Sequence, residues 1–213
     1  MLFLVFGSSG AGKTTAVTAL RGRVSRLALH DFDEIAVPRG ADTAWRHRAY
    51  EQWTRRAIEY QADGVDLLLV GQTPLGELLA TPSASRLEAV SACLFDCDDA
   101  TRLARLEARG PEWLERIGGN LEAYFGWAAW MRQHAEDPTS RREVIRIDAT
   151  LDEMRWSRWD DWQRGDPRWR VHTVDTAALS VEEVAADLVA WIEVERDILR
   201  SGTHPLTGLA LGA

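Results

Sequence analysis

Apolar residues gather along the chain in short, nearly continuous runs that alternate with longer segments of helical periodicity. Runs of this kind, bounded by turn residues, are typical of strands that are buried on both faces of a parallel sheet. Five segments fit this description: Leu2–Phe6, Arg26–His30, Asp66–Gly71, Ala92–Asp96 and Arg170–Asp175. Helical segments lie between them at Thr14–Arg21, Thr43–Ala62, Asp99–Arg109 and Val181–Arg200. The alternation predicts an α/β fold with a five-stranded parallel sheet and helices on both of its faces.

The interval from Gly110 to about Arg168 interrupts the alternation. It contains a helical run, Asn120–Glu136, and a candidate short strand, Glu143–Asp148. Seven of the ten tryptophans lie in it or at its edge, at positions 113, 127, 130, 156, 159, 162 and 169. Trp156, Trp159 and Trp162 recur every three residues, which favours packing in a core over a stacking platform for a base or sugar ring.

These patterns divide the chain into four parts. We predict that residues 1–109 form a core and that residues 110–168 form a tryptophan-rich helical insertion, folded over this core as a lid. Residues 169–200 return to the core with the last strand and helix. Residues 201–213 form a short, glycine-rich tail that we predict to be loosely attached.

The composition excludes some classes of protein. Asp and Glu outnumber Lys and Arg by 33 to 25, and the net charge of −8 argues against a general nucleic-acid binder. No apolar run approaches the roughly 20 residues that span a bilayer, so we expect no membrane partner. Cys93 and Cys97 indicate small core residues of a reduced cytoplasmic protein, because their spacing on a strand is too wide for a disulfide.

The chain contains a single lysine, Lys13, among 24 arginines. It closes the segment Gly7-Ser8-Ser9-Gly10-Ala11-Gly12-Lys13-Thr14, which matches the phosphate-binding P-loop pattern. Glycines let the backbone N–H groups curl around a polyphosphate at a helix N-terminus. We predict that residues 7–15, with Thr15 as the last, bind nucleotide. Lys13 is expected to be catalytic and to reach the β- and γ-phosphates, and the Thr14 hydroxyl is expected to bind Mg²⁺. Residues 1–109 are then the nucleotide-binding core, and the insertion, residues 110–168, is the lid over the ATP site.

Two carboxylates, Asp31 and Asp33, follow the second predicted strand. Ligands of open α/β sheets bind beyond the carboxyl ends of the strands, so both side chains are expected to face the phosphate loop. One could hold Mg²⁺ while the other accepts the proton of an attacking hydroxyl. The alternative is a turn or a helix cap, since Asp is common at both.

These motifs resemble those of the P-loop small-molecule kinases of the shikimate, gluconate and adenylate kinase type. The resemblance covers roughly residues 1–111 and the last strand and helix. It implies the sheet order 2-3-1-4-5, ATP and Mg²⁺ as cofactors, Asp31 on the metal side and Asp33 as the base or orienting residue. It also implies that Arg109 covers the adenine and that Arg116, in the lid, contacts the transferred phosphate.

Candidate residues for the acceptor site come from the end of the third strand and from the long helix before it. The third strand ends in Gly71-Gln72-Thr73 without the metal-binding acid of a motor ATPase, which leaves Gln72 able to bind a neutral polar substrate or to cap the strand. Arg55 and Arg56 lie on the helix that borders the acceptor in the kinases, and at most one of them is expected to point inward.

We therefore predict an ATP- and Mg²⁺-dependent kinase that phosphorylates a hydroxyl of a small molecule, such as a nucleoside, nucleotide, sugar acid or antibiotic-like polyol. Two alternatives stay open. A polynucleotide 5′-hydroxyl kinase would share the loop and an Asp after the second strand, although a nucleic-acid partner conflicts with the net charge. A nucleotide-dependent switch or binding module would instead gate a partner through the tryptophan-rich insertion. The sequence leaves the oligomeric state undetermined.

Overall fold

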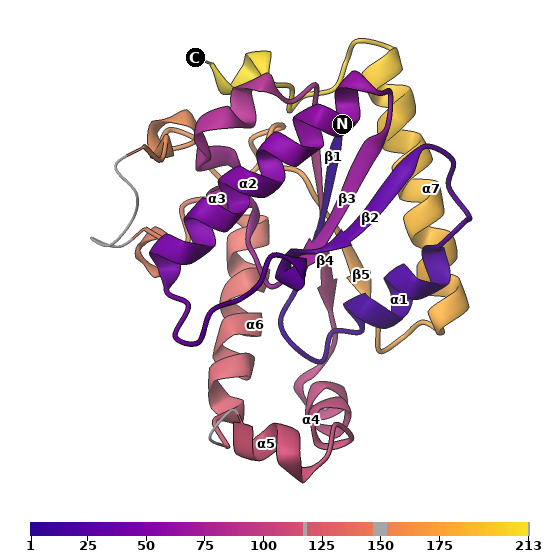
Figure 1. Ribbon diagram of the computed structural model, residues 1–213, viewed down its shortest axis with the longest axis vertical. Helices are drawn as coiled ribbons and strands as arrows, with labels where there is room; N and C mark the ends of the chain where they lie inside the picture. Colours follow the sequence, from indigo (N-terminus) through magenta and orange to yellow (C-terminus); the bar gives the residue numbers. More distant parts are fainter. Residues whose placement is uncertain (117–118, 147–152, 213) are drawn as a thin grey trace.

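A computed structural model describes residues 1–116, 119–146 and 153–212, with only the backbone of Leu114 and Arg116. The strands are β1 (Leu2–Phe6), β2 (Leu27–Asp31), β3 (Asp66–Gly71), β4 (Val90–Asp96) and β5 (Val171–Asp175). They form one parallel sheet in the order β2-β3-β1-β4-β5 (Figure 1). The predicted sheet and its order are confirmed, with boundaries that differ by one or two residues at β2, β4 and β5.

Helices cover both faces of this sheet. They are α1 (Lys13–Leu20), α2 (Thr43–Ala62), α3 (Leu75–Ala80), α4 (Asp99–Glu107), α5 (Pro111–Arg116), α6 (Leu121–Glu136) and α7 (Val181–Arg200). α1 and α7 pack on one face, and α2 and α3 pack on the other (Figure 1). α4 and α5 project beyond the carboxyl ends of the strands, below the sheet in this view.

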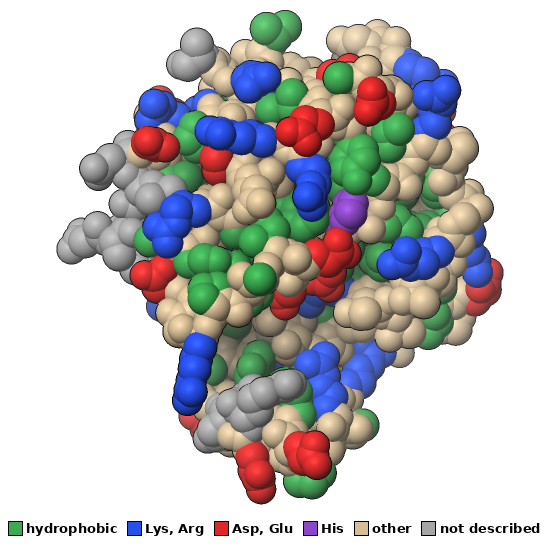
Figure 2. All heavy atoms as spheres, viewed as in Figure 1, with side chains coloured by type: hydrophobic (Ala, Val, Ile, Leu, Met, Phe, Trp, Pro, Cys, Tyr) green, Lys and Arg blue, Asp and Glu red, His purple; other side chains and the backbone are tan. Residues whose placement is uncertain are grey.

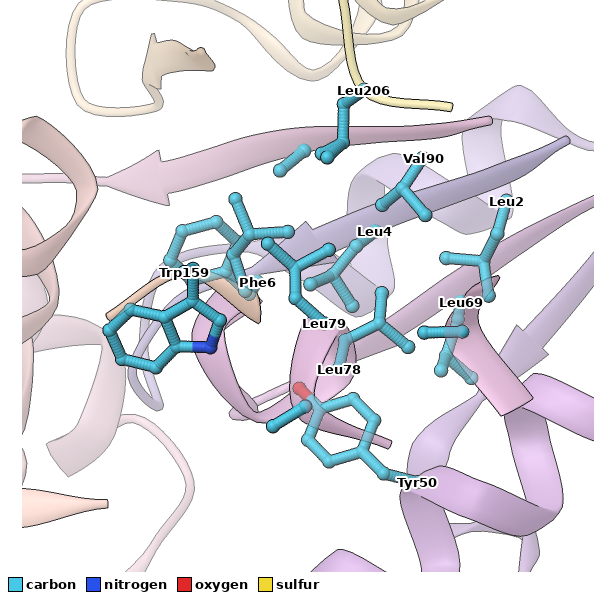
Figure 3. Packing of buried hydrophobic residues seen from close by; sticks show 14 of the residues in the cluster. Leu2, Leu4, Phe6, Tyr50, Leu69, Leu78, Leu79, Val90, Trp159 and Leu206 are labelled. Atoms are coloured by element: carbon cyan, nitrogen blue, oxygen red, sulfur yellow. The ribbon is translucent and has the colours of Figure 1, made fainter. Parts of the chain in front are cut away.

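The central strand β1 supplies both halves of the core because successive side chains of a strand point to opposite faces. Leu2, Leu4 and Phe6 face α2 and α3, and Phe3 and Val5 face α1 and α7. All five are buried. Figure 3 shows the first of these faces, where leucines of β1, β3 and α3 interdigitate with Tyr50 of α2. Burial of each large apolar side chain contributes about 1.5–3 kcal/mol, so β1 is firmly fixed beneath the loop that follows it.

The tryptophan-rich segment belongs to this core. Trp156, Trp159 and Trp162 are buried, which confirms the core interpretation of their spacing. The indole N–H of Trp159 donates to the carbonyl oxygen of Gly76 at 3.0 Å, and Arg158 donates to the carbonyl oxygens of α3 and the turn after it. This cover separates α3 from solvent, and all six residues of the helix are buried. The prediction that the whole insertion, residues 110–168, folds over the nucleotide site is therefore wrong for residues 155–159, which cover α3 instead.

Two further expectations need correction. The candidate strand Glu143–Asp148 begins in a 3-10 turn, Arg142–Val144, and residues 147 and 148 fall in the undescribed range. The tail is attached rather than loose. The N–H of Val90 donates to the carbonyl oxygen of Leu206 at 3.0 Å, and Leu206 and Leu211 are each 3% exposed. Apolar side chains at the start of β4 hold the tail, a contact that its glycine content does not reveal.

Candidate active site

The loop between β1 and α1 owes its shape to three glycines. Gly7, Gly10 and Gly12 have φ angles of 157°, 83° and 80°, a region that other residues rarely enter. A Cβ atom at Gly7 would lie 2.3 Å from the carbonyl oxygen of Phe95, and one at Gly10 would lie 3.0 Å from Cγ of Arg102. The loop is thus tightly folded against β4 and α4 and leads directly into α1, the arrangement that presents backbone N–H groups to an anion.

Side chains from α4 and from the end of β5 hold this loop from behind. Arg102 is fully buried, and it donates to the carbonyl oxygen of Ser9 at 2.8 Å and to Asp96 at 2.7 Å. The Thr176 hydroxyl donates to the carbonyl oxygen of Ala11 at 3.0 Å. Sequence reasoning missed both residues. The position of Arg102 on the buried face of α4, beside Leu106, was the available signal.

Lys13 turns back onto the loop. Its Nζ donates to the carbonyl oxygens of Gly7 at 2.6 Å and Ser8 at 3.1 Å. Burial of the ammonium group lowers its pKa to about 7, against the opposing attraction of Asp31. The lysine is therefore held by carbonyl dipoles in a half-buried position, where an added negative charge would interact with it more strongly than in open water.

A cavity of about 190 Å³ lies in front of the loop. It brings together most of the residues that the sequence singled out: Ser9, Gly10, Gly12, Lys13, Thr14, Thr15, Asp31, Asp33, Gly71, Gln72 and Arg109. Gly7, Ser8 and Ala11 belong to the same loop but do not line the cavity.

The two carboxylates leave β2 on a short 3-10 turn, η1 (Phe32–Glu34). Asp31 caps this turn by accepting the N–H of Asp33 at 3.0 Å, and Glu34 completes a capping box. The cap that we weighed as an alternative is thus present at Asp31, which also lines the cavity. Burial and the neighbouring charge of Asp31 raise the pKa of Asp33, and Lys13 opposes the rise. A carboxylate with a raised pKa is better suited to accept a proton.

Gln72 connects three elements at the end of β3. Its Oε1 accepts the N–H of Ser9 at 3.2 Å, and its carbonyl oxygen accepts the indole N–H of Trp127 at 3.2 Å. The hydroxyl of Ser8 donates to the carbonyl oxygen of Tyr124 at 2.8 Å. The first turns of α6 are therefore bonded both to the phosphate loop and to β3.

A second cavity, of about 350 Å³, shares Gly10, Gly12, Thr15 and Arg109 with the first. Its other lining residues come from α1, from α4 and its C-cap, from the segment after β5, and from the first turn of α7: Ala16, Arg105, Ala108, Thr176, Leu179, Val181 and Val184. Arg109 also lies over the ring of Trp113, with its Cζ 4.9 Å from the ring centroid. A cleft lined by alanine, leucine and valine side chains together with the Arg105 and Arg109 guanidinium groups, and continuous with a phosphate cradle, has the form of a site for a flat ring.

The predicted acceptor arginines do not reach these cavities. Arg55 is 65% exposed and donates to Glu51 at 2.6 Å, while Arg56 lies over the ring of Trp53. Both lie in the second half of α2, which runs away from the carboxyl ends of the strands (Figure 1). Arg116 ends α5, and its side chain is outside the described part. Another arginine of α2, Arg46, lies over the ring of Trp127, whose indole N–H donates to the carbonyl oxygen of Gln72.

The donors in the cavity suit Mg²⁺ bound together with phosphate. The Thr14 hydroxyl and the carboxylates of Asp31 and Asp33 are hard oxygen donors, the type that Mg²⁺ prefers. Among the described residues no group of three or more His, Cys, Asp or Glu side chains could hold a metal ion. The side chains therefore suit an ion that keeps water and phosphate oxygens as its other ligands.

Comparison with known proteins supports the fold. No protein-family model and no curated protein sequence matches the chain. Among solved structures, it is similar to a sugar kinase from Janibacter sp. HTCC2649, with a TM-score of 0.53, 14% identity, and 91% and 94% of the two chains covered. It is also similar to thymidylate kinase from Candida albicans, with a TM-score of 0.50, 11% identity and 92% of each chain covered. The chain has a P-loop kinase-like fold.

At these identities the likeness establishes the fold of the chain and not its substrate. The residues of its own cavities must carry any argument about the reaction. No helix within the described ranges is long and apolar enough to cross a membrane.

Proposed function

We propose that the protein is a kinase that transfers the γ-phosphate of ATP to a hydroxyl group of a small molecule. The observation that carries this proposal is the joint presence of Lys13, Asp31 and Asp33 in one cavity of about 190 Å³. A phosphate loop alone would suit any nucleotide-binding protein. A second carboxylate beside the lysine adds a group that can receive the proton of an acceptor.

The reaction divides among the chain's residues as follows. The loop amides and Lys13 bind the phosphates, and the cavity between Arg109 and Val181 takes the adenine. The acceptor oxygen forms a bond to the γ-phosphorus while the bond from that phosphorus to the bridging oxygen breaks, and ADP leaves with the electron pair. Asp33 takes the proton of the acceptor hydroxyl, which its raised pKa favours.

Thr14 and Asp31 are the residues that would hold Mg²⁺. When bound, this ion neutralises charge on the phosphates. Asp31 also positions Asp33 through the cap on η1, so its carboxylate serves the metal and the base together.

Exclusion of water is the task of the lid. Water competes with the acceptor hydroxyl, so the open side of the cavity must be covered during transfer. We assign this task to α5, which follows Arg109 and is preceded by Gly110 at a φ of 87°. Residues 155–159, which cover α3, and the first turns of α6, which are bonded to the phosphate loop and β3, would stay in place.

The test is an ATP-consumption screen over nucleosides, sugars and aminoglycoside-like alcohols. We expect at least one acceptor to stimulate turnover above the basal rate, and Asp33→Asn to lower the stimulated kcat by about 10²–10⁴-fold, the usual contribution of a general base. Asp63→Asn, at the far end of α2, is the matched control. If the stimulation survives Asp33→Asn, the assignment of the base is wrong. If no acceptor stimulates turnover although ATP binds, a nucleotide-dependent switch becomes the better interpretation.

A further inference from the structure

The two sides of the phosphate cavity differ in charge. The loop and the end of α4 contribute Lys13 and Arg109, whereas the ends of β2 and β3 contribute Asp31, Asp33, Gly71 and Gln72. Figure 2 shows the same contrast on the surface: carboxylates gather over η1, and Lys and Arg side chains lie across the hollow beneath it. Since the cations lie on the side of the nucleotide, the acceptor must be recognised by the acidic and amide groups of the β2–β3 side.

Arg46 of α2, which lies over the ring of Trp127 beside Gln72, is already paired with a carboxylate. Arg46 contacts both carboxylate oxygens of Glu77 through its Nε, at 2.9 and 2.8 Å, and through Nη2, at 2.5 Å. Glu77 is fully buried and also contacts His47 at 3.2 Å. The attraction of Arg46 holds the pKa of Glu77 low against the effect of burial. An acceptor carboxylate or phosphate would have to compete with this buried partner, so Arg46 is a poor anion site.

Gln72 presents hydrogen-bond donors to the same side. The N–H of Ser9 occupies its Oε1, which fixes the orientation of the amide. The amide nitrogen, with two N–H groups, has no hydrogen-bond partner among the described residues, and Gln72 lines the cavity. A neutral amide of this kind binds a hydroxyl or carbonyl oxygen.

We propose that the phosphate acceptor is an uncharged polyhydroxy compound, bound through one oxygen at Asp33 and through a second oxygen at the amide nitrogen of Gln72. This inference rests on the proposed kinase function and narrows its substrate class. It excludes nucleotides and sugar acids, because their negative charge would lie beside Asp31, Asp33 and the transferred phosphate with no unpaired cation of the described β2–β3 wall to offset it.

Matched pairs of acceptors test the charge directly. ATP consumption is measured with an aldose and its aldonic acid, a nucleoside and its 5′-monophosphate, and a cyclitol and its carboxylated counterpart. We expect the neutral member of at least one pair to have a kcat/KM about tenfold or more above that of the anionic member, since one uncompensated charge at short range is worth at least that factor. A preference for the anionic member overturns the inference and leaves the kinase function intact. If the protein binds ATP but no acceptor stimulates ATP consumption, the kinase function itself is overturned.

A pair of variants tests the role of Gln72. Gln72→Met keeps the length of the side chain and removes its donors, so KM for the neutral acceptor should rise about tenfold, as expected for one lost hydrogen bond. KM for ATP should change much less. Gln61→Met is the control, because the Gln61 side chain hydrogen-bonds to the backbone of residues 86 and 88, just before β4 and so near the amino ends of the strands. If Gln72→Met leaves KM for the acceptor unchanged, or raises only KM for ATP, then Gln72 supports the phosphate loop and takes no part in acceptor recognition.

Discussion

The carboxylate of Asp31 accepts the backbone N–H of Asp33 at 3.0 Å, so one member of the acidic pair sets the position of the other. The pair had two interpretations in the sequence, a catalytic site and a helix cap, and the structure combines them. Asp31 caps the turn that brings Asp33 to the cavity, and both carboxylates lie within reach of the phosphate loop.

Substitution of Asp31 should separate its two roles. Asp31→Ala removes the cap and should lower the free energy of unfolding by about 1 kcal/mol, the usual loss at an N-cap. Asp31→Asn keeps a capping oxygen and should preserve most of that stability, while losing the charge that would hold Mg²⁺. Urea unfolding measures the first effect, and the Mg²⁺ dependence of turnover measures the second. Equal destabilisation in the two variants would contradict the capping role.

The lowered pKa of Lys13 predicts that nucleotide affinity falls as pH rises above about 7. Free protein loses the proton of Lys13 near that pH, whereas bound phosphate favours the ammonium form and raises its pKa. Binding should therefore take up as much as one proton above pH 7, which weakens affinity by up to about tenfold per pH unit. Calorimetry of ATP binding in buffers of different ionisation enthalpy measures this uptake. Absence of proton uptake at about pH 8 in the wild-type protein would refute the prediction, and Lys13→Met is the control that should lack it.

Gly71 sets the distance between β3 and the turn that carries Asp33. A Cβ atom there would lie 2.9 Å from Cβ of Phe32 and 2.8 Å from the Thr73 hydroxyl. Gly71→Ala should displace η1, lower kcat, and destabilise the protein by about 1–3 kcal/mol, as overpacking usually does.

Gly126→Ala is the matched control for that variant. Gly126 lies in α6 with no atom within 4 Å of the added methyl group, so alanine there should leave kcat unchanged and stability equal or higher. Equal kcat values for the two variants would show that η1 accommodates the methyl group without moving Asp33.

The tail should contribute to stability through its buried leucines. Leu206 is 3% exposed, and Leu209, three residues later, is 95% exposed. Leu206→Ala should lower the free energy of unfolding by about 2–5 kcal/mol, the range for buried leucines. Leu209→Ala should change it by no more than about 0.5 kcal/mol. Thermal or urea unfolding of the two variants compares them, and a small effect at Leu206 would restore the expectation of a loosely attached tail.

Much of the fold could be read from the sequence because its signals are local. The glycine pattern of the loop, the five apolar runs and the Ser180 capping box each act within a few residues, and the structure contains all of them. α3 was missed because a six-residue helix buried on every side shows no amphipathic period.

The acceptor side of the site could not be read in the same way. The expectation rested on Arg55 and Arg56, but the phase of α2 and its direction along the sheet turn both away from the cavity. Arg46 lies over Trp127, which contacts Gln72, and the sequence gives no sign that Glu77, 31 residues later, neutralises this arginine.

The sequence by itself determined the phosphate-loop backbone, since Gly7, Gly10, Gly12 and Lys13 lie within one short segment and the glycines act through local backbone geometry. Only the tertiary structure decided which charges face one another across the cavity. The ends of β2 and β3 bring Asp33 and Gln72 into one cavity, and the packing of α2 on α3 pairs Arg46 with the buried Glu77, in each case between residues far apart in the chain. Such contacts depend on the packing of the whole sheet and its helices, which no local pattern encodes.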